Sequence, residues 1–356
     1  GCVARLDGLV DRFGRRITYM RISVTDKCNL RCVYCMPEEG VKARAHGEML
    51  TMEEFARVVR VASSLGISRV RITGGEPLAR KGVVSLVQAV AAIPGIRDIS
   101  MTTNATMLAP VADELARAGL KRVNISLDSL KPDAYARLTR RGDLASAVVG
   151  IQAAERAGLR PIRLNAVVLR GINSDEIESL AALTLRHCWD VRFIEFMPFW
   201  GNGGLFGEEC VVPIDEIRRR VQAMGVEDRS PQRAAAKATN VCATGGESAA
   251  TPGENRSGPA SYLRLRGGLG QVGFISRDGD EFCGACNRIR LTADGMLRPC
   301  LLSEVSIDVK TALRGGADDN VVADLLRRAV AAKPESGRSR GADGLWEARP
   351  LSQIGG

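Results

Sequence analysis

The sequence predicts an α/β fold, an incomplete (β/α)6 TIM-like barrel with a C-terminal extension. Short β-branched runs alternate with helical patterns from Tyr19 to about Met197 and recur roughly every thirty residues, which is the spacing of βα units. The runs are mostly apolar, as parallel strands buried on both faces are. Because six units are fewer than the eight that close a full barrel, we expect an open barrel whose missing side needs a lid.

The expected strands follow one another in the first part of the chain. They are Met20–Val24, Arg69–Thr73, Ile99–Thr103, Arg122–Leu127, Arg163–Leu169 and Val191–Phe196. A helix is expected at Thr51–Leu65, because Thr51 and Glu54 form a capping box and the apolar residues after them repeat at helical spacing.

The composition changes past Arg229. The stretch from Arg229 to Ala260 contains no Leu, Ile, Phe, Tyr or Trp, which predicts a loop or insert. A strand is then expected at Gln271–Ser276 and a helix at Asn320–Ala332. We therefore divide the chain into a partial barrel at residues 1–228, an insert at 229–260 and a C-terminal segment at 261–356 that closes the barrel.

The composition also excludes several classes of protein. Apolar residues make up 45% of the chain, which excludes general disorder. The longest apolar stretch, Val83–Ile96, is too short to cross a membrane, because a spanning helix needs about 20 residues. Only two histidines are present, so we discount sites built on histidine clusters. Ten cysteines with no visible secretory signal indicate a reducing compartment, the cytoplasm, and metal or cluster ligation.

Three cysteines, Cys28, Cys32 and Cys35, follow the first expected strand. A disulfide would leave one thiol over, and a zinc site would need a fourth ligand nearby, whereas three thiolates suit a [4Fe-4S] cluster with one open iron. A zinc knuckle is the alternative. After the second expected strand, Gly74 and Gly75 allow a backbone to approach a small ligand closely, while Glu76 or a carbonyl receives an ammonium group. A simple tight turn is the alternative there.

A second group of three cysteines lies near the other end of the chain. Cys283 and Cys286 precede Cys300, and Asp294-Gly295 between two alternating runs predicts a hairpin that returns Cys300 close to Cys286. The alternative is a structural zinc site completed by Cys188, Cys210, Cys242 or a histidine. Arg288 and Arg290 share one face of the expected strand and suit an anion, although they could also lie on a solvated face.

The segments CNLRCVYC and GGEP resemble those of the radical S-adenosylmethionine (SAM) superfamily. The resemblance implies that Cys28, Cys32 and Cys35 hold a [4Fe-4S] cluster, that the methionine part of the cofactor binds the open iron, and that one electron cleaves the sulfonium to a 5'-deoxyadenosyl radical. The fold class becomes an incomplete (β/α)6 radical SAM barrel whose C-terminal extension carries a second Fe-S cluster on Cys283, Cys286 and Cys300.

Over nearly the whole chain, the sequence resembles the GTP 3',8-cyclase family of molybdenum cofactor biosynthesis, through RISVTDKCNLRCVYCMP, RITGGEPLAR, NISLDSL, VRFIEFMP, FCGACNRIRLTADG, GQVGFIS and the terminal Gly-Gly. The resemblance implies a lyase that converts GTP and S-adenosylmethionine to (8S)-3',8-cyclo-7,8-dihydroguanosine 5'-triphosphate. It implies two [4Fe-4S] clusters, an external one-electron donor and a downstream cyclic pyranopterin synthase. No nucleic-acid or membrane partner is expected, and a homodimer is compatible with the sequence.

Family positions carried onto this chain give two sets of residues. The expected S-adenosylmethionine contacts are Tyr34, Gly75, Ser126 and Met197. The expected GTP contacts, at or near strands facing one end of the barrel, are Arg21, Arg71, Thr102, Arg163, Arg288 and Arg290.

The chain also departs from the family pattern. Arg163 stands where a Lys is usual, and Asn104-Ala105 replaces the usual Asn-Gly, which we expect to alter a turn. Two alternative functions are another radical SAM enzyme with an auxiliary cluster, such as a peptide-modifying one, and a cysteine-rich nucleic-acid-binding protein. The second is motivated by a net charge of +9, but aromatic residues make up only 4% of the chain.

Overall fold

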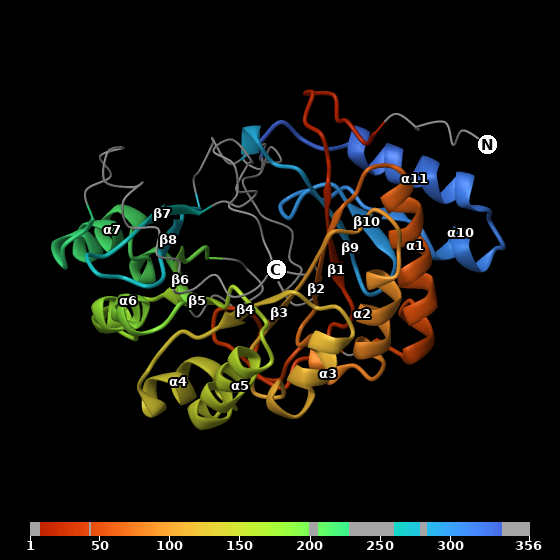
Figure 1. Cartoon of the computed structure of the whole chain (residues 1–356). Coiled ribbons are helices and arrows are strands. Elements are labelled where there is room, and N and C mark those ends of the chain that lie inside the picture. Colours follow the sequence, from red (N-terminus) through yellow and green to blue (C-terminus); the bar gives the residue numbers. More distant parts are fainter. Residues whose placement is uncertain (1–7, 43, 199–205, 228–259, 278–282, 337–356) are drawn as a thin grey trace.

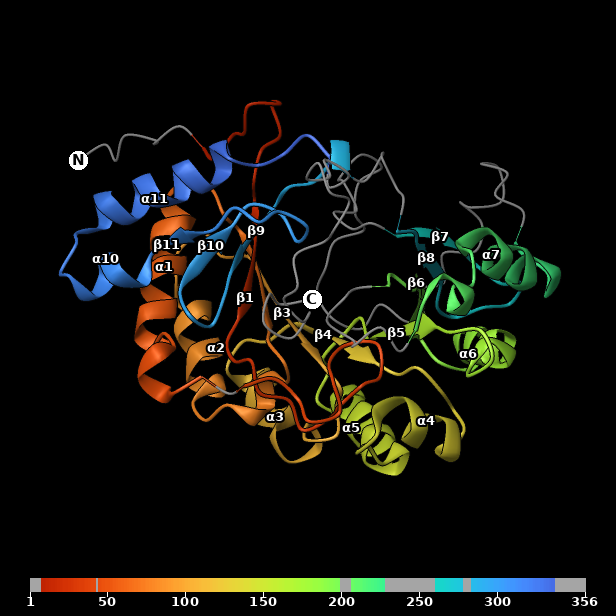
Figure 2. The same ribbon diagram turned by 180° about the vertical axis from the view of Figure 1, so that it is seen from behind.

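The computed structural model describes residues 8–42, 44–198, 206–227, 260–277 and 283–336. One strongly curved sheet forms its centre, and most of the helices cover the outer side of that sheet (Figures 1 and 2). In the described residues the sheet has 11 strands in the order β11-β10-β9-β1-β2-β3-β4-β5-β6-β8-β7. The expected α/β class with a mainly parallel sheet is confirmed.

All six strands expected from the first part of the chain are present, with ends that differ by at most one residue. They are β1 (Tyr19–Ser23), β2 (Arg69–Thr73), β3 (Asp98–Thr103), β4 (Arg122–Ser126), β5 (Arg163–Val168) and β6 (Asp190–Glu195). Each pairs in parallel with the next along the chain.

Helices follow these strands and form the outer layer. The α-helices are α1 (Met52–Ser64), α2 (Val83–Ala91), α3 (Ala112–Arg117), α4 (Pro132–Thr139), α5 (Leu144–Arg156), α6 (Ile177–Arg186), α7 (Ile214–Ala223), α10 (Lys310–Arg314) and α11 (Asp319–Ala331). Short 3-10 turns are η1 (His46–Glu48), η2 (Pro77–Ala79), η3 (Ala109–Val111), η4 (Ser174–Glu176) and η6 (Glu208–Cys210). The capping box of α1 is confirmed: Thr51 Oγ1 accepts from Glu54 N, and the Glu54 carboxylate accepts from Thr51 N.

Alternation along the strands separates an apolar outer face from a polar inner face. On β1, Met20 and Ile22 are fully buried in the core that also contains Phe55 of α1. Arg21 lies between them in sequence and therefore points to the opposite, inner face. Burial of the outer face against helices stabilises the barrel by the hydrophobic effect, which leaves the inner face for polar side chains.

The C-terminal segment supplies strands to both edges of this sheet. They are β7 (Ser261–Leu263), β8 (Val272–Ile275), β9 (Arg288–Leu291), β10 (Met296–Arg298) and β11 (Ile307–Asp308). β8 pairs in parallel with β6, and β9 pairs in parallel with β1, so the parallel part of the sheet extends beyond the six expected strands. The hairpin at Asp294-Gly295 is confirmed: β9 and β10 are antiparallel, and Gly295 has φ +81.

Other expectations in this half fall partly outside the described residues. The strand expected at Gln271–Ser276 is β8, and the helix expected at Asn320–Ala332 is α11. Residues 229–259 of the expected insert lie outside the described part, as does the terminal Gly-Gly. Within the described residues, no helix has the length and apolar character needed to span a membrane.

Candidate active site

The two cysteine groups lie at opposite ends of β1. Cys28, Cys32 and Cys35, the first triad, lie in the loop that leaves the carboxyl end of β1. Cys283, Cys286 and Cys300, the second triad, lie where β9 begins and just after β10 ends. Because Arg288 of β9 is paired with Tyr19 of β1, the second triad belongs to the amino end of β1. A strand of five residues separates these ends by roughly 17 Å at about 3.3 Å per residue.

The first triad is a set of half-buried cysteines that form no disulfide bond and are held by short turns. Cys35 N donates to Cys32 O at 2.8 Å, and Leu30 N donates toward Cys28 Sγ at 3.4 Å. Burial raises the pKa of Cys32 well above its ordinary value, and Asp128 and the other two thiols of the triad raise it further. The three sulfur atoms are therefore close enough to affect one another electrostatically.

Gly74 and Gly75 bring the loop after β2 against the loop that carries the first triad. A Cβ on Gly75 would lie 2.4 Å from Lys27 O, and one on Gly74 would lie 2.6 Å from Thr25 O. Gly75 N donates to Thr25 O at 2.7 Å. The glycines thus permit a close approach between two backbones, which sets the position of the cysteine loop.

Glu76 is engaged inside the protein through its carboxylate. Its Oε1 accepts from Thr103 Oγ1 at 2.7 Å and from Leu78 N at 3.1 Å, and its Oε2 accepts from Asn104 N at 2.8 Å. The side chain is 1% exposed, and burial raises its pKa to about 7. The ammonium acceptor expected here, Glu76 or a backbone carbonyl, stays a prediction.

Ala105, in the turn after β3, stands where the family usually has Gly. It has φ 63, the left-handed conformation that favours glycine. The cost is local strain in a buried alanine. The expected alteration of this turn stays a prediction.

The four expected S-adenosylmethionine contacts all lie at carboxyl ends of strands. Gly75 follows β2, Ser126 ends β4, and Met197 follows β6. Tyr34, in the first triad's loop, donates from its hydroxyl to Asp128 Oδ2 at 2.7 Å, while Asp128 Oδ1 accepts from Val167 N at 2.9 Å. Burial raises the pKa of Asp128 to about 6. This chain of bonds fixes the tyrosine ring against the ends of β4 and β5.

Arginines from adjacent strands stand side by side on the inner face. The register pairs Arg290 with Arg21 and Arg21 with Arg71. The Tyr19 ring lies beside two guanidinium groups, with Arg71 Cζ 5.5 Å and Arg288 Cζ 5.8 Å from its centroid. Sequence analysis placed these residues toward one end of the barrel. The register instead places them along its inside, between the two triads.

Burial makes this group of charges costly. It lowers the pKa of Arg21 well below its ordinary value, and Arg290 and Arg71 lower it further. Burial also lowers the pKa of Arg71 and of Arg290 to about 10 each. Buried cations that act on one another in this way need anionic compensation, which a polyphosphate supplies.

Thr102 of β3 and Arg163 of β5 lie on either side of β4, because Asn124 of β4 is paired with both. The Thr102 hydroxyl is buried and has no hydrogen-bond partner in the described part of the chain. Arg163 Nε lies 3.5 Å from Asp190 Oδ2 in an ion pair.

The second triad is surrounded by cations. Cys286 N donates to Cys283 O at 3.2 Å, and the pairing of Arg298 with Arg290 returns the chain so that Cys300 lies near the start of β9. Although burial opposes it, the pKa of Cys286 is lowered by Lys333 and Arg288. The expected convergence of the thiols is supported by Arg290, which interacts electrostatically with both Cys286 and Cys300.

The donor sets fit iron-sulfur clusters better than single zinc ions. Across the described ranges, no three His, Cys, Asp or Glu side chains surround one ion position. Zinc would draw each sulfur to about 2.3 Å from one centre, whereas a cluster offers a separate iron to each thiolate. Cys188 was one of the fourth ligands considered for a zinc site. It is disulfide-bonded and therefore has no thiolate to offer a zinc ion.

Three functional candidates were missed by sequence reasoning. Arg192, 6% exposed, donates to Asn124 Oδ1 at 2.6 Å and to Asn165 Oδ1 at 2.9 Å on the inner face. The alternation of side chains along β6 could have predicted that Arg192 points to the inner face. Lys333 and Arg15 contact the second triad's segment from positions distant in sequence, and no local pattern marks them.

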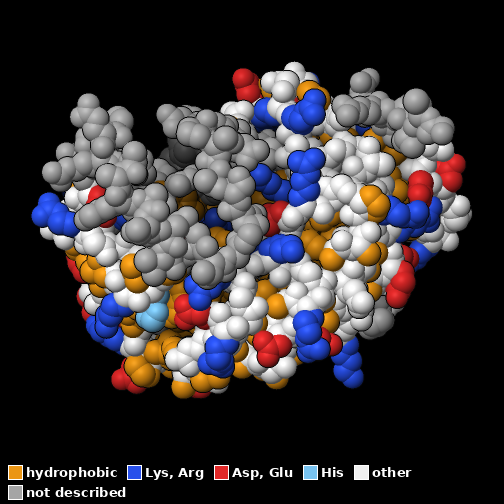
Figure 3. Space-filling view, viewed as in Figure 1, with side chains coloured by type: hydrophobic (Ala, Val, Ile, Leu, Met, Phe, Trp, Pro, Cys, Tyr) orange, Lys and Arg blue, Asp and Glu red, His pale blue; other side chains and the backbone are white. Residues whose placement is uncertain are grey.

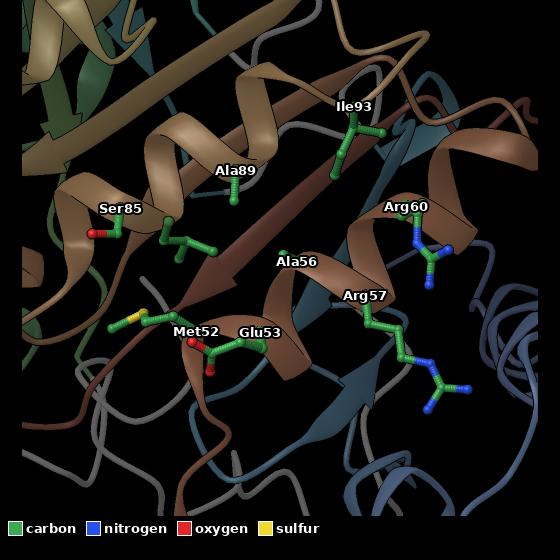
Figure 4. Close-up of a pocket in the computed structure, with 9 residues that line it drawn as sticks. Met52, Glu53, Ala56, Arg57, Arg60, Ser85, Ala89 and Ile93 are labelled. Atoms are coloured by element: carbon green, nitrogen blue, oxygen red, sulfur yellow. The ribbon is translucent and has the colours of Figure 1, made fainter.

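A surface cavity of about 540 Å³ lies elsewhere, between α1 and α2 (Figure 4). Met52, Arg57, Ser85 and Ala89 are among its lining residues, and none of the expected site residues is. On the face shown in Figure 3, Lys and Arg side chains are scattered among acidic and apolar ones.

Comparison with known proteins identifies the family. Residues 22–184 match the Radical SAM superfamily, and residues 243–338 match Molybdenum Cofactor Synthesis C. A GTP 3',8-cyclase of Pelotomaculum thermopropionicum is 47% identical over 349 residues, which are 97% of this chain and 99% of that protein. A GTP 3',8-cyclase of Moorella thermoacetica is 47% identical over 346 residues, with coverage of 97% and 99%.

Solved structures support the fold. The crystal structure of Streptococcus suis SuiB bound to S-adenosylmethionine matches with a TM-score of 0.57 and 15% identity, over 87% of this chain and 68% of that one. At 15% identity the match shows the fold alone. Together, the two cysteine triads, the inner arginines and these relatives establish that the chain belongs to the GTP 3',8-cyclase family of the radical SAM superfamily.

Proposed function

We propose that this chain converts GTP and S-adenosylmethionine to (8S)-3',8-cyclo-7,8-dihydroguanosine 5'-triphosphate, the first step of molybdenum cofactor biosynthesis, with one [4Fe-4S] cluster on each triad. Cys28, Cys32 and Cys35 would hold the first cluster, and Cys283, Cys286 and Cys300 the second. The observation that carries the proposal is the row of arginines on the inner face, between two sets of three cysteines at opposite ends of β1.

Held by Cys28, Cys32 and Cys35, the first cluster with S-adenosylmethionine would supply one-electron cleavage of the sulfonium and thereby radical chemistry at the ribose. The chain's own residues have to place the cofactor at the carboxyl ends of the strands. Tyr34, fixed by Asp128, provides a rigid ring there, and Gly75, Ser126 and Met197 lie at the carboxyl ends of the alternate strands β2, β4 and β6.

The inner face would bind the triphosphate. Arg21, Arg71, Arg288 and Arg290 supply guanidinium forks that match phosphate oxygens, and Thr102 supplies a hydroxyl with its hydrogen-bonding capacity unused. Arg163 contributes a charge already shared with Asp190. Since a radical is unselective, two anchors on GTP, the arginines and the second triad, restrict which hydrogen can be reached.

The remaining expectations are kept as parts of the proposal. The chain acts in the cytoplasm, receives electrons from an external one-electron donor and passes its product to a cyclic pyranopterin synthase. The net charge of +9 favours an acidic donor protein, because opposite charges increase encounter rates. The division at residues 1–228, 229–260 and 261–356 assigns one triad to each outer segment.

The test is the Cys300→Ser variant, assayed anaerobically with reductant, S-adenosylmethionine and GTP. We expect 5'-deoxyadenosine formation to persist at the first triad and cyclic product to fall below detection. Cys210→Ser is the matched control, because Cys210 is also a free, half-buried thiol but lies on η6. Cyclic product from Cys300→Ser at the wild-type rate would refute the role of the second triad.

A further inference from the structure

Lys333 is a buried lysine beside the second triad. It follows the end of α11 and is only 2% exposed. Its Nζ donates to Arg288 O at 2.9 Å and to Pro299 O at 2.9 Å. One carbonyl belongs to the first residue of β9, and the other precedes Cys300, so a single ammonium group ties the two ends of the hairpin together.

The same ammonium group lies beside the second triad. Arg288, whose carbonyl it binds, lies two residues after Cys286, and Pro299 directly precedes Cys300. The two contacts therefore hold the positive charge of Lys333 between the two chain segments that carry these thiols.

A second side chain holds the Lys333 segment in place. Arg15 is 9% exposed and pairs with Asp11 at 2.6 Å. Its guanidinium donates to Pro334 O at 2.5 Å and to Cys283 O at 2.6 Å. The backbone carbonyls of Pro334, the residue after Lys333, and of Cys283 are thus bonded to one rigid fork, which keeps the ammonium group and the triad at a fixed separation.

The charge of Lys333 needs a counter-ion. A buried ammonium group is costly unless it is paired with an anion. Among the residues that the structure describes, no carboxylate forms an ion pair with Lys333, and the neighbouring charged side chains Arg288 and Arg290 are cations. The anionic groups at hand are the thiolates of the second triad. A cluster bound by three thiolates would supply negative charge at this position.

We propose that Lys333 is a positioning residue of the second triad, whose ammonium group is the counter-ion of the thiolate-bound cluster and joins the two ends of the hairpin that holds it. This inference depends on the proposed second cluster. A fixed positive charge beside a cluster favours its reduced form, because reduction adds negative charge.

The test measures the reduction midpoint of the second cluster by anaerobic EPR titration. The full chain carries Cys28→Ala, Cys32→Ala and Cys35→Ala, so that one cluster contributes. In Lys333→Met, which keeps the length and removes the charge, we expect the reduced-to-oxidised ratio at a fixed potential to fall about tenfold, ~59 mV for one electron. Lys333→Arg is expected to keep the midpoint. Lys310→Met is the matched control, because Lys310 Nζ also donates to a carbonyl, Glu48 O at 2.9 Å, but on another surface.

Iron and zinc contents separate this inference from the proposed function. Zinc in place of iron at the second triad of the unsubstituted chain would overturn the proposed function and this inference with it. Iron at that triad with the same midpoint in Lys333→Met would overturn only the inference. If Lys333→Met binds no iron at the second triad, the iron content of Lys333→Arg decides the matter. Full iron in Lys333→Arg supports the counter-ion role, and loss of iron in both variants overturns it.

Discussion

The two triads differ in how the chain assembles them and in the charge that surrounds them. The first comes from one short loop, and burial raises the pKa of Cys28 and Cys32 there, with Glu76 and Asp128 adding to it. The second is assembled from both ends of a hairpin, and Lys333 and Arg288 lower the pKa of Cys286. The first environment favours neutral thiols in the absence of iron, and the second favours a thiolate.

The two triads thus offer the same three thiol donors in opposite electrostatic surroundings. The site proposed to bind a sulfonium cofactor has an acidic and neutral surrounding, with Asp128 and Glu76 buried near it. The site proposed to meet a polyanionic substrate has a cationic surrounding, with Arg288, Arg290 and Lys333. The arginines on the inner face belong to the second environment and extend it toward the first.

The largest effect is expected from the first triad. Cys32→Ser removes a ligand on which every later event depends, so both 5'-deoxyadenosine formation and cyclic product should fall to background. Cys300→Ser should lose only the second activity. Both products can be quantified in one chromatographic assay. Retention of cofactor cleavage by Cys32→Ser would contradict the assignment of the cofactor to this end of β1.

The next effect is expected from the inner face. Arg290→Gln removes a buried cation, so kcat/KM for GTP should fall about 100-fold, or ~3 kcal/mol, the cost of leaving a buried phosphate charge unpaired. The rate of S-adenosylmethionine cleavage measured without GTP should stay within about twofold of the wild-type rate, because substitutions at distant sites act nearly independently. The control is Arg156→Gln, because Arg156 is exposed at the end of α5. Equal losses in both variants would show that general charge matters instead of this position.

A smaller effect is expected from Glu76, whose pKa in the folded chain is raised to about 7 from an ordinary 4.5. A raised carboxyl pKa gives stability that is complete below pH 4.5 and is lost as the pH rises through 7. Glu76→Gln lacks this dependence. The variant should therefore gain up to roughly 3 kcal/mol of unfolding free energy relative to wild type between about pH 5 and 8, at about 1.36 kcal/mol per pKa unit.

Urea titrations of the iron-free chains at several pH values measure this difference. Asp143→Asn serves as the control, because Asp143 is an exposed helix cap whose pKa is lowered instead. An unfolding free-energy difference between Glu76→Gln and wild type that stays constant with pH would contradict the burial argument.

The smallest effect is expected from Thr102→Val, which keeps the shape and removes the unpartnered hydroxyl. The substrate-free chain should lose no stability, since no hydrogen bond of the described residues is broken. The KM for GTP should rise about 2- to 12-fold, the worth of one hydrogen bond at about 0.5–1.5 kcal/mol. Lower stability with an unchanged KM would show that Thr102 is only a packing residue.

Local signals predicted much of the fold. The six βα strands, the capping box at Thr51 and the hairpin at Asp294-Gly295 are set by alternation, side-chain caps and turn residues that are close in sequence. The positions of β8 beside β6 and of β9 beside β1 were not predicted, because strand pairing across some 80 to 270 residues depends on tertiary contacts.

The candidate site was predictable to the same extent. Both cysteine triads are visible from spacing and from the hairpin, and the inner direction of the arginines follows from strand alternation. The use of Glu76 by Thr103 and Asn104 was not, because its partners follow a different strand. Lys333 and Arg15 were missed for the same reason, since their contacts join distant parts of the chain.

The most direct test of the account is the iron, acid-labile sulfide and zinc content of the chain after anaerobic purification. Two [4Fe-4S] clusters predict about eight irons and about eight sulfides per chain, without zinc. About four irons with one zinc would contradict the account, because the second triad would then be a structural zinc site and the arginines would border no second cluster.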